Sequence, residues 1–308
     1  MKLLKSNISI LENFLNLYWI RPEIAVWRTL DVMLLKSINL SEPIIDLGCG
    51  DGSFAFTLFD GKTTSNFDVY KTISNTRGFY DGKDIHIHRK IINPTIIKKP
   101  IKKIQVGLDH KISLIEKASA FDIYEKLIQH DLEKPLPFGN AVFNTVFSNV
   151  FYWIKNIENV LLESSRICKR NGRIVLFLPD SQFKKYLIYT MYKKHGYKWA
   201  RILDRGIYRN TKHCYTRRKW ECIFSRLGLS IDLHYNYLSP NFVNLWNVIT
   251  RPYSPYLIEL ANQVSTVKRN EVKKRAIKEL KPLLVSILDN EIKSIGRGNC
   301  FHLFVLKK

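Results

Sequence analysis

The sequence has no long apolar run, few cysteines and few acidic residues, and these shortages exclude several classes of protein. No apolar segment reaches the ~18 to 20 residues that a membrane-spanning helix needs, so we expect no transmembrane segment and at most peripheral membrane contact. The five cysteines are odd in number and form no Cys-x-x-Cys pair, which favours a reducing, cytoplasmic location over a disulfide framework. No histidine pair has helical metal-ligand spacing; His86 and His88 come nearest, and we expect no metal site.

The shortage of acidic residues leaves 49 Lys and Arg against 27 Asp and Glu, a formal net charge of +22. Such a charge attracts phosphates, nucleic acid, acidic carrier proteins or anionic lipid surfaces. The alternative is a composition rich in Lys, Asn and Ile, which leaves a solvated basic surface without a function. Charge alone does not decide between these alternatives.

Apolar strands alternate with amphipathic helices along most of the 308 residues. This alternation predicts an α/β fold in which a Rossmann-like, doubly wound sheet is covered by helices on both faces. The Asn171-Gly172 pair predicts a turn before the fifth strand. Seven strands are expected, at residues 44–47, 104–109, 126–131, 142–149, 173–178, 231–235 and 301–306.

The same pattern predicts how the chain is divided. Helical periodicity over residues 8–38, with Pro22 between two helices, indicates an N-terminal helical cap. The expected units are the cap at 1–40, a main domain at 41–238 and 300–308 that contains an insertion at 60–103 and a basic segment at 181–220, and a helical insertion or substrate-side cap at 239–299.

A glycine-rich turn, Asp46-Leu47-Gly48-Cys49-Gly50-Asp51-Gly52, follows the first strand. Glycines let the backbone pass close to a ligand because no Cβ stands in the way, and the helix that follows presents unpaired N–H groups. Taken alone, such a turn is also a common structural turn.

Two later strands end in a carboxylate. Asp109 follows the second strand, where a carboxylate can accept hydrogen bonds from both hydroxyls of a ribose. Asp131 follows the third, where it can accept a hydrogen bond from an exocyclic amine such as adenine N6. Either acidic residue alone could simply cap a helix. Because the carboxyl ends of parallel strands converge on one crevice, we expect the glycine turn and both carboxylates to meet there.

The glycine turn, Asp109, His130-Asp131-Leu132 with Leu136-Pro137-Phe138, and Ser148-Asn149 occur in this order with helices between them. In this pattern the chain resembles the class I S-adenosylmethionine (SAM)-dependent methyltransferases, most closely the small-molecule branch called type 11. The resemblance implies a seven-stranded sheet whose last strand runs antiparallel between strands five and six. It also implies that SAM is the cofactor.

The resemblance covers residues 43–179 and the two final strands, and it assigns the binding roles. Asp46 and the glycine turn would hold the methionine part of SAM, and Asp109 would bind the ribose. Asp131 with Leu132 would frame the adenine, and Asn149 would line the methionine end and the methyl group. The implied cofactor set is Asp46, Gly48, Cys49, Gly50, Gly52, Asp109, His110, Asp131, Leu132 and Asn149.

Two departures matter. The family passes from the glycine helix to the second strand in roughly a dozen residues, whereas here the gap exceeds forty, which puts the contacts of that helix in doubt. A nicotinamide enzyme would instead carry Gly-x-Gly-x-x-Gly. Here the third glycine comes one residue early and is followed by Ser53 and bulky Phe54, which favours SAM.

The methyl acceptor is less well indicated. After the fourth strand, residues 148–153 read Ser-Asn-Val-Phe-Tyr-Trp, unlike the Asn-Pro-Pro-Tyr motif that holds a planar amine. We expect the acceptor side to come from residues 181–253 and the N-terminal helices, with Trp27-Arg28 covering the cofactor as a lid would. Residues 181–220 hold twelve Lys and Arg, one acidic residue and interleaved aromatics, which suits phosphate-bearing substrates or single-stranded nucleic acid. A solvated basic face is the alternative.

Three loops look ordered: Arg21-Pro22-Glu23, Asp204-Arg205-Gly206 and Arg251-Pro252-Tyr253. The residues considered as a catalytic base are His213, His195, Asp204 and His234. For each histidine the alternative is a buried, satisfied core position, and for Asp204 it is a plain turn.

Three hypotheses about function follow. The first is a methyltransferase acting on an oxygen or carbon of an anionic small molecule, saccharide or lipid-linked acceptor. The second is an RNA methyltransferase that uses the basic surface, whose binding would weaken steeply with salt. The third is a non-catalytic SAM-fold protein that binds a partner. The sequence does not indicate the oligomeric state.

Overall fold

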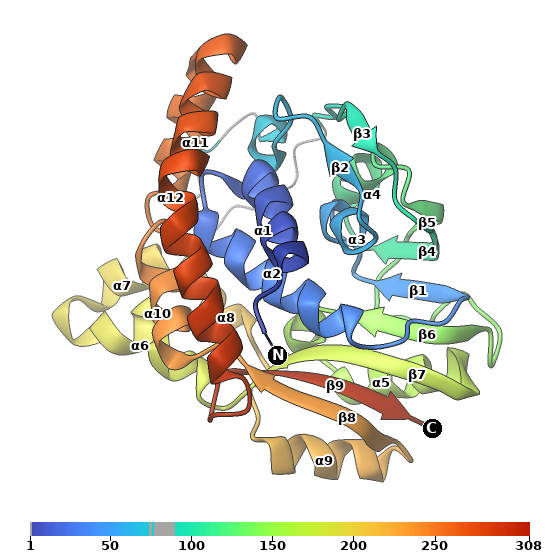
Figure 1. The fold of residues 1–308 in the computed structure, drawn as a ribbon. Coiled ribbons are helices and arrows are strands. Elements are labelled where there is room, and N and C mark those ends of the chain that lie inside the picture. Colours follow the sequence, from blue (N-terminus) through green and yellow to red (C-terminus); the bar gives the residue numbers. More distant parts are fainter. Residues whose placement is uncertain (1, 74–75, 77–89) are drawn as a thin grey trace.

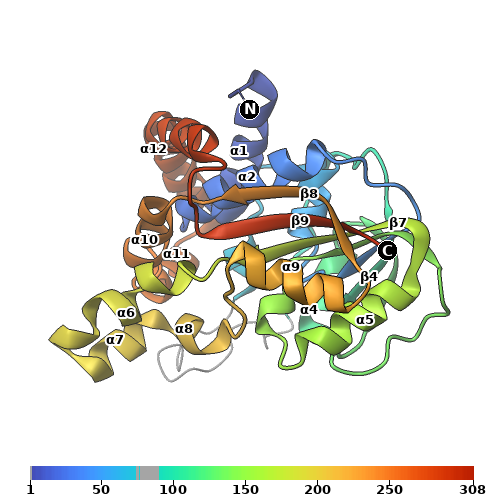
Figure 2. The same ribbon diagram turned by 90° about the horizontal axis from the view of Figure 1, so that it is seen from below.

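The computed structural model describes residues 2–73, 76 and 90–308, and it shows a seven-stranded sheet between layers of helices (Figures 1 and 2). The strand order is β5-β4-β1-β6-β7-β9-β8, and β9 runs antiparallel to both of its neighbours. The predicted doubly wound sheet with an antiparallel last strand is therefore confirmed. The strands are β1 (Ile44–Leu47), β4 (Ile104–Asp109), β5 (Tyr124–Gln129), β6 (Phe143–Ser148), β7 (Cys168–Pro179), β8 (Ser230–Tyr237) and β9 (Phe301–Lys307).

The turn predicted at Asn171-Gly172 is wrong, because both residues lie within β7. The register of β7 on β6 slips here: Phe143 pairs with Cys168, but Thr145 pairs with Arg173. A Cβ on Gly172 would approach to 2.7 Å of a neighbouring sulfur and 2.9 Å of a backbone oxygen. Gly172 thus permits a close backbone approach in an irregular strand. In the sequence alone, a glycine with this role looks the same as a glycine in a turn.

Helices bury both faces of the sheet. In Figure 2, α5 (Ile157–Ile167) and α9 (Arg217–Arg226) lie on one side, and α1 (Lys5–Tyr18) and α2 (Pro22–Lys36) lie on the other. Strand β7 shows the alternation that this requires. Its Val175 and Phe177 belong to the apolar cluster that contains α1 and α2, whereas Ile174, Leu176 and Leu178 belong to the cluster that contains α5 and α9.

The other helices surround the carboxyl ends of the strands or flank the sheet. The long helix α12 runs beside α1 and α2, and α6 and α7 project beyond the sheet (Figure 1). None of the helices within the described residues is long and apolar enough to cross a membrane. The helices other than α1, α2, α5 and α9 are α3 (Ser53–Leu58), α4 (Ile112–Ser119), α6 (Ile188–Tyr192), α7 (Tyr197–Asp204), α8 (Ile207–Asn210), α10 (Pro240–Val248), α11 (Ser254–Gln263) and α12 (Thr266–Ser294). The short 3-10 turns are η1 (Val69–Thr72), η3 (Phe151–Trp153), η4 (Phe183–Tyr186) and η5 (Lys193–His195).

The described part of the segment at 60–103 contains short elements. Strands β2 (Lys62–Thr63) and β3 (Ile96–Lys98) form a small antiparallel sheet, and η1 lies between them in sequence. His86 and His88, the two histidines considered in the sequence as the nearest to a metal-ligand pair, lie outside the described residues.

Helix α12 fastens this segment to the rest of the molecule. The buried guanidinium of Arg269 donates to both carboxylate oxygens of Asp68, at 3.2 and 2.8 Å. Asp68 in turn accepts the backbone N–H of Tyr70, at 3.1 Å. One turn along α12, the buried Lys273 donates to the carbonyl of Phe67, at 2.6 Å. The position of η1 therefore depends on a helix about two hundred residues away in sequence.

Breaking this buried ion pair should destabilise the protein. We expect Arg269→Met to lower the free energy of unfolding by about 3 to 5 kcal/mol, because it leaves the Asp68 carboxylate buried without its partner. Urea unfolding followed by circular dichroism measures this. The control is Arg275→Met on the exposed face of the same helix, whose guanidinium is 4.0 Å from Glu279 and which should change stability by at most about 0.5 kcal/mol. Equal effects of the two substitutions would contradict the prediction.

Candidate active site

The glycine turn after β1 is held against the end of β4. The carbonyl of Leu108 accepts the N–H groups of Gly48 and Cys49, at 2.7 and 2.9 Å. The N–H of Gly50 donates to Asp109 Oδ2, at 3.1 Å. The turn and the carboxylate that follows the neighbouring strand are thus joined by hydrogen bonds, as expected where parallel strands end together.

Two of the glycines are required by close approach. A Cβ on Gly48 would lie 2.3 Å from a methyl carbon of Val150, and a Cβ on Gly52 would lie 3.1 Å from the Cα of Ala118. Both residues also have positive φ, 88° and 77°, a conformation that side chains disfavour. Gly48 lets the segment after β6 approach the turn, whereas Gly52 lets α3 pack on α4.

Asp46 is almost completely buried, and its Oδ2 accepts a hydrogen bond of 2.8 Å from the hydroxyl of Tyr124. Burial raises the pKa of the Asp46 carboxyl to about 7, with the Tyr124 hydrogen bond opposing the shift and the Asp109 carboxylate adding to it. A positive charge placed beside this carboxyl group would stabilise its ionised form.

Asp109 is buried at the end of β4. Besides Gly50 N–H on Oδ2, its Oδ1 accepts the N–H of Lys111, at 2.9 Å. Each carboxylate oxygen has two lone-pair directions, so both can accept a further hydrogen bond from a ligand. The ring of His110 lies 3.4 Å from Asp109 Oδ1.

A cavity of about 730 Å³ opens at these strand ends, within the range of pockets that hold cofactor-sized ligands. Its lining includes nine of the ten residues implied as the cofactor set; Gly52 is absent from the lining, consistent with its packing role. The nine are Asp46, Gly48, Cys49, Gly50, Asp109, His110, Asp131, Leu132 and Asn149.

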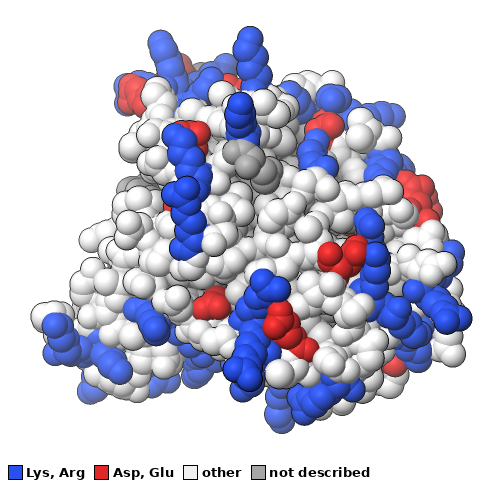
Figure 3. Space-filling view, turned by 60° about the horizontal axis from the view of Figure 1, so that its bottom comes forward, with Lys and Arg blue, Asp and Glu red and all other residues white. Residues whose placement is uncertain are grey.

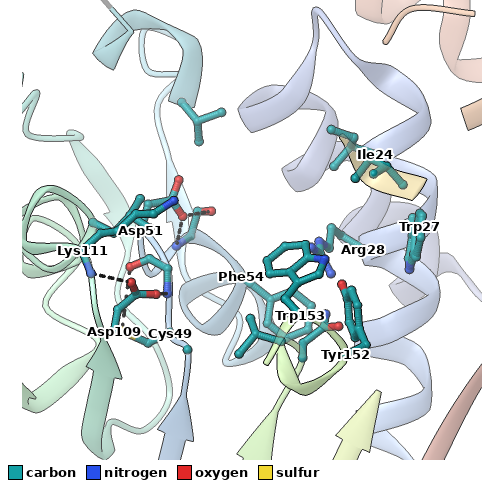
Figure 4. A pocket seen from close by; sticks show the side chains of 18 of the residues that line it. Ile24, Trp27, Arg28, Cys49, Asp51, Phe54, Asp109, Lys111, Tyr152 and Trp153 are labelled. Carbon is teal, nitrogen blue, oxygen red and sulfur yellow. Dashed lines mark hydrogen bonds between the residues drawn. The ribbon is translucent and has the colours of Figure 1, made fainter. Parts of the chain in front are cut away.

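The cavity continues beyond these residues into a second half, which other segments enclose. Figure 4 shows Asp109, Cys49 and Asp51 on one side and Phe54, Arg28 and Tyr152 on the other. The Arg28 guanidinium pairs with Asp31 at 2.9 Å and lies 5.6 Å from the centre of the Phe54 ring. Further lining residues of this half are Arg21, Trp27, Tyr70, Phe183, Arg205, Thr211, Trp246, Arg251 and Phe301.

The four residues considered as a catalytic base all lie in the described part of the chain, and none of them lines the cavity. His213 bonds to the carbonyl of Ile154, at 2.8 Å. His234 stacks on the Phe304 ring, and burial lowers its pKa to about 4. His195 is exposed at η5, and Asp204 caps α8 by accepting the N–H of Tyr208, at 2.9 Å. A base must reach the proton that it removes, and none of these four side chains borders the space in which a substrate would bind.

Several lining residues could not be singled out in sequence. Trp246 and Phe183 fit a helical apolar pattern as well as any core residue, and Tyr70 lies in an irregular stretch. The sequence did indicate some residues of this half through its loops. Arg21, Arg205 and Arg251 belong to the three segments predicted to be ordered, and the structure brings all three to one cavity.

Comparison with known proteins gives one family match and several structures of similar fold. Residues 98–176 match the family model described as a methyltransferase domain. No curated protein matches the sequence. Among solved structures, the fold is similar to that of a SAM-dependent methyltransferase of Thermotoga maritima described as a possible histamine N-methyltransferase (13% identity, 68% of this chain and 73% of that chain, TM-score 0.43). It is also similar to the YcgJ protein of Bacillus subtilis (12%, 89% and 94%, 0.41) and to a geranyl diphosphate methyltransferase in complex with SAM (13%, 93% and 90%, 0.42).

The strand order, with its antiparallel strand β9 between β7 and β8, is that of a Rossmann-like fold, and residues 98–176 within it match a methyltransferase domain. The residues present fit the cofactor: buried carboxylates of Asp46 and Asp109 suit a ligand that carries an ammonium group and a ribose diol, and the cavity beside them is of sufficient size.

Removing the Asp109 carboxylate should weaken SAM binding. We expect Asp109→Ala to raise the Kd for SAM roughly tenfold or more, because each charge-assisted hydrogen bond that is lost contributes about 1.5 to 3 kcal/mol. Isothermal titration calorimetry measures the Kd. Asp289→Ala, which removes a carboxylate paired with Lys293 on α12, serves as the control and should leave the Kd unchanged. An unchanged Kd in Asp109→Ala would show that the ribose lies elsewhere.

The affinity for SAM should also depend on pH through Asp46. Its carboxyl, with a pKa of about 7, is mostly protonated below that pH and ionised above it, and only the ionised form attracts the cationic ammonium and sulfonium groups. The Kd should therefore fall as the pH is raised from about 6 to 8. Asp46→Asn should show a flat profile over this range. A wild-type profile as flat as that of the variant would rule out Asp46 as the titrating group.

Proposed function

We propose that the protein transfers a methyl group from SAM to an oxygen or carbon of an anionic small molecule, saccharide or lipid-linked acceptor that binds in the second half of the cavity. The observation that supports this most is the continuity of the cavity. It runs from the residues beside Asp109 to a space enclosed by α2, η4, α10 and the loops around Arg205 and Arg251. An acceptor held there would lie in the same cavity as the methyl donor.

The described side chains of this half are suited to orienting an acceptor and not to removing a proton from it. Among the described residues, those lining it are aromatic, apolar, hydroxyl or cationic, whereas the lining carboxylates, such as Asp46 and Asp109, lie toward the cofactor side. When bound, SAM supplies an electrophilic methyl group on its sulfonium. The chain's own contribution is then alignment of donor and acceptor, which by itself can account for a large part of the rate. An acceptor whose nucleophilic atom is already ionised, or has a low pKa, fits such a site.

An RNA acceptor remains the second hypothesis, supported by the net charge of +22. On the face drawn in Figure 3, however, Lys and Arg side chains stand in separate groups with uncharged surface between them. A protein that follows a nucleic-acid backbone presents a continuous basic groove. The enclosed second half of the cavity therefore favours a small acceptor.

We further propose the domain organisation and location that the sequence suggested. Residues 1–40 would act as a cap, because α2 contributes Trp27 and Arg28 to the cavity wall. Residues 239–299 would act as a substrate-side cap, because Trp246, Arg251 and Ile258 also line it. The five cysteines are free within the structure, in keeping with a reducing cytoplasmic location.

Methyl-labelled SAM incubated with the protein and fractionated cell extract tests the proposal. We expect label in the metabolite, saccharide or lipid fraction, strongly reduced with Asp109→Ala and unchanged with Asp289→Ala. Label in RNA, together with binding to bulk RNA that weakens steeply with salt, would instead establish the second hypothesis. SAM binding with no labelled fraction would favour a non-catalytic SAM-fold protein.

A further inference from the structure

Three buried hydrogen-bond donors in the second half of the cavity have no partner within the described structure. They are Arg21 Nη2, Arg251 Nε and the hydroxyl of Tyr70. All three residues line the cavity, and each is at most 7% exposed. Buried polar groups in folded proteins are nearly always hydrogen-bonded, so a cluster of exceptions calls for an explanation.

These donors belong to one electrostatic group. Arg21 lies close enough to both of the others to shift their titration: burial raises the pKa of Tyr70 and Arg21 opposes that rise, while burial and then Arg21 lower the pKa of Arg251 to about 9. Arg205 joins the group by donating to the carbonyl of Arg251, at 3.1 Å. Like charges gathered in a buried site destabilise one another unless an anion compensates them.

Two carboxylates act on these guanidinium groups. Glu23 pairs with Arg21 Nε at 2.8 Å, and Asp204 is the other carboxylate acting on Arg251. Burial raises the pKa of Asp204, which makes its negative charge harder to maintain. The carboxylates therefore satisfy only some of the N–H groups of Arg21 and Arg251 within the described residues.

An indole lies beside the two guanidinium groups. The ring centre of Trp246 is 5.9 Å from the Arg21 carbon and 5.3 Å from the Arg251 carbon. Trp27 lies on this indole as well, with its ring centre 4.9 Å away. The subsite therefore combines donors for an oxyanion with an aromatic wall for an apolar body.

We propose that Arg21, Arg251 and Tyr70 form the subsite that holds the oxyanion of the methyl acceptor, a phosphate or carboxylate carried on an apolar body that packs against Trp246. Guanidinium groups suit both anions because their planar donors match two oxygens at once. The inference rests on the proposed function, since it assigns this end of the cavity to the acceptor. It adds the kind of molecule that the site selects.

Small aromatic probes test the subsite without knowledge of the natural acceptor. Phenyl phosphate, benzoate and phenol are titrated separately into the full-length protein, with and without SAM, and binding is measured by calorimetry. We expect one or both anions to bind saturably and phenol to bind at least about tenfold more weakly, because phenol offers no charge to the donors. Preference for phenyl phosphate would indicate a phosphorylated acceptor, and preference for benzoate a carboxylic acid. Binding of both anions no tighter than that of phenol would overturn the proposal.

Single substitutions test whether the anion binds at these residues. Arg251→Met should weaken the preferred anion at least about tenfold, and Tyr70→Phe, which removes a single oxygen, roughly two- to tenfold. Arg217→Met, which breaks an exposed pair with Glu221 on α9, should have no effect. Without an anion, Arg251→Met should melt no lower than the wild type, because it removes a buried cation whose Nε has no partner within the described residues. A lower Tm with unchanged anion affinity would identify Arg251 as a structural residue and contradict the inference.

The SAM titration separates the two proposals. Arg251→Met should change the Kd for SAM by no more than about twofold, because the residue lies in the other half of the cavity. If SAM does not bind the wild type, the proposed function fails, while the anion titration still reports on the subsite. If SAM binds and the anions show no preference, only the subsite is wrong.

Discussion

The parallel pairing of β1 with β4 and β6 is the constraint on which the active site depends. It brings three strand ends together, and the hydrogen bonds from the glycine turn to Leu108 and Asp109 join two of them. The third is joined by contact, because Gly48 leaves just enough room for Val150. A strained or bulky residue in this turn would separate the strand ends and the cavity with them. The cofactor half is thus a direct product of sheet geometry, built from neighbouring strands whose backbones fix the distances.

The second half of the cavity, which we propose to hold the acceptor, is built differently. Phe301 is on strand β9, but polar residues of this half come from the loop between α1 and α2, from η1, from the end of α7 and from the loop before α11, which the sheet does not align. These segments are positioned by long-range side-chain contacts. Arg269 on α12 holds Asp68 and thereby η1, and Arg205 reaches the carbonyl of Arg251 and the hydroxyl of Ser254. Such contacts can change without disturbing the sheet, so this half can diverge in specificity while the cofactor half is retained.

The difference between the two halves of the cavity explains which of its residues could be predicted from the sequence. Strand ends follow local patterns, so Asp46, the glycine turn and Asp109 could be assigned to one crevice, although β5 ends at Gln129 and leaves Asp131 in the loop beyond. A glycine in sequence does not distinguish a turn from a close approach within a strand, and Gly172 was misassigned for that reason. No local pattern reports that Arg21 and Arg251, some 230 residues apart, share a cavity. The basic segment at 181–220 stood out in the sequence by its charge, yet its His195 is exposed and its Asp204 accepts the N–H of Tyr208, and neither residue lines the cavity.

For selective binding of an anion, the position of a positive charge matters more than the total net charge of the protein. Most of the surplus of +22 comes from solvated side chains, which cost little to keep ionised and bind phosphates weakly and without selection. Arg21 and Arg251 are instead among the few buried cations, beside an indole, and each has one N–H group without a partner in the described residues. Keeping them ionised without an anion lowers the stability of the folded protein, whereas an anion that enters relieves that cost and is bound the more tightly for it. The interaction that weakens the empty site is therefore the same one that would select its acceptor.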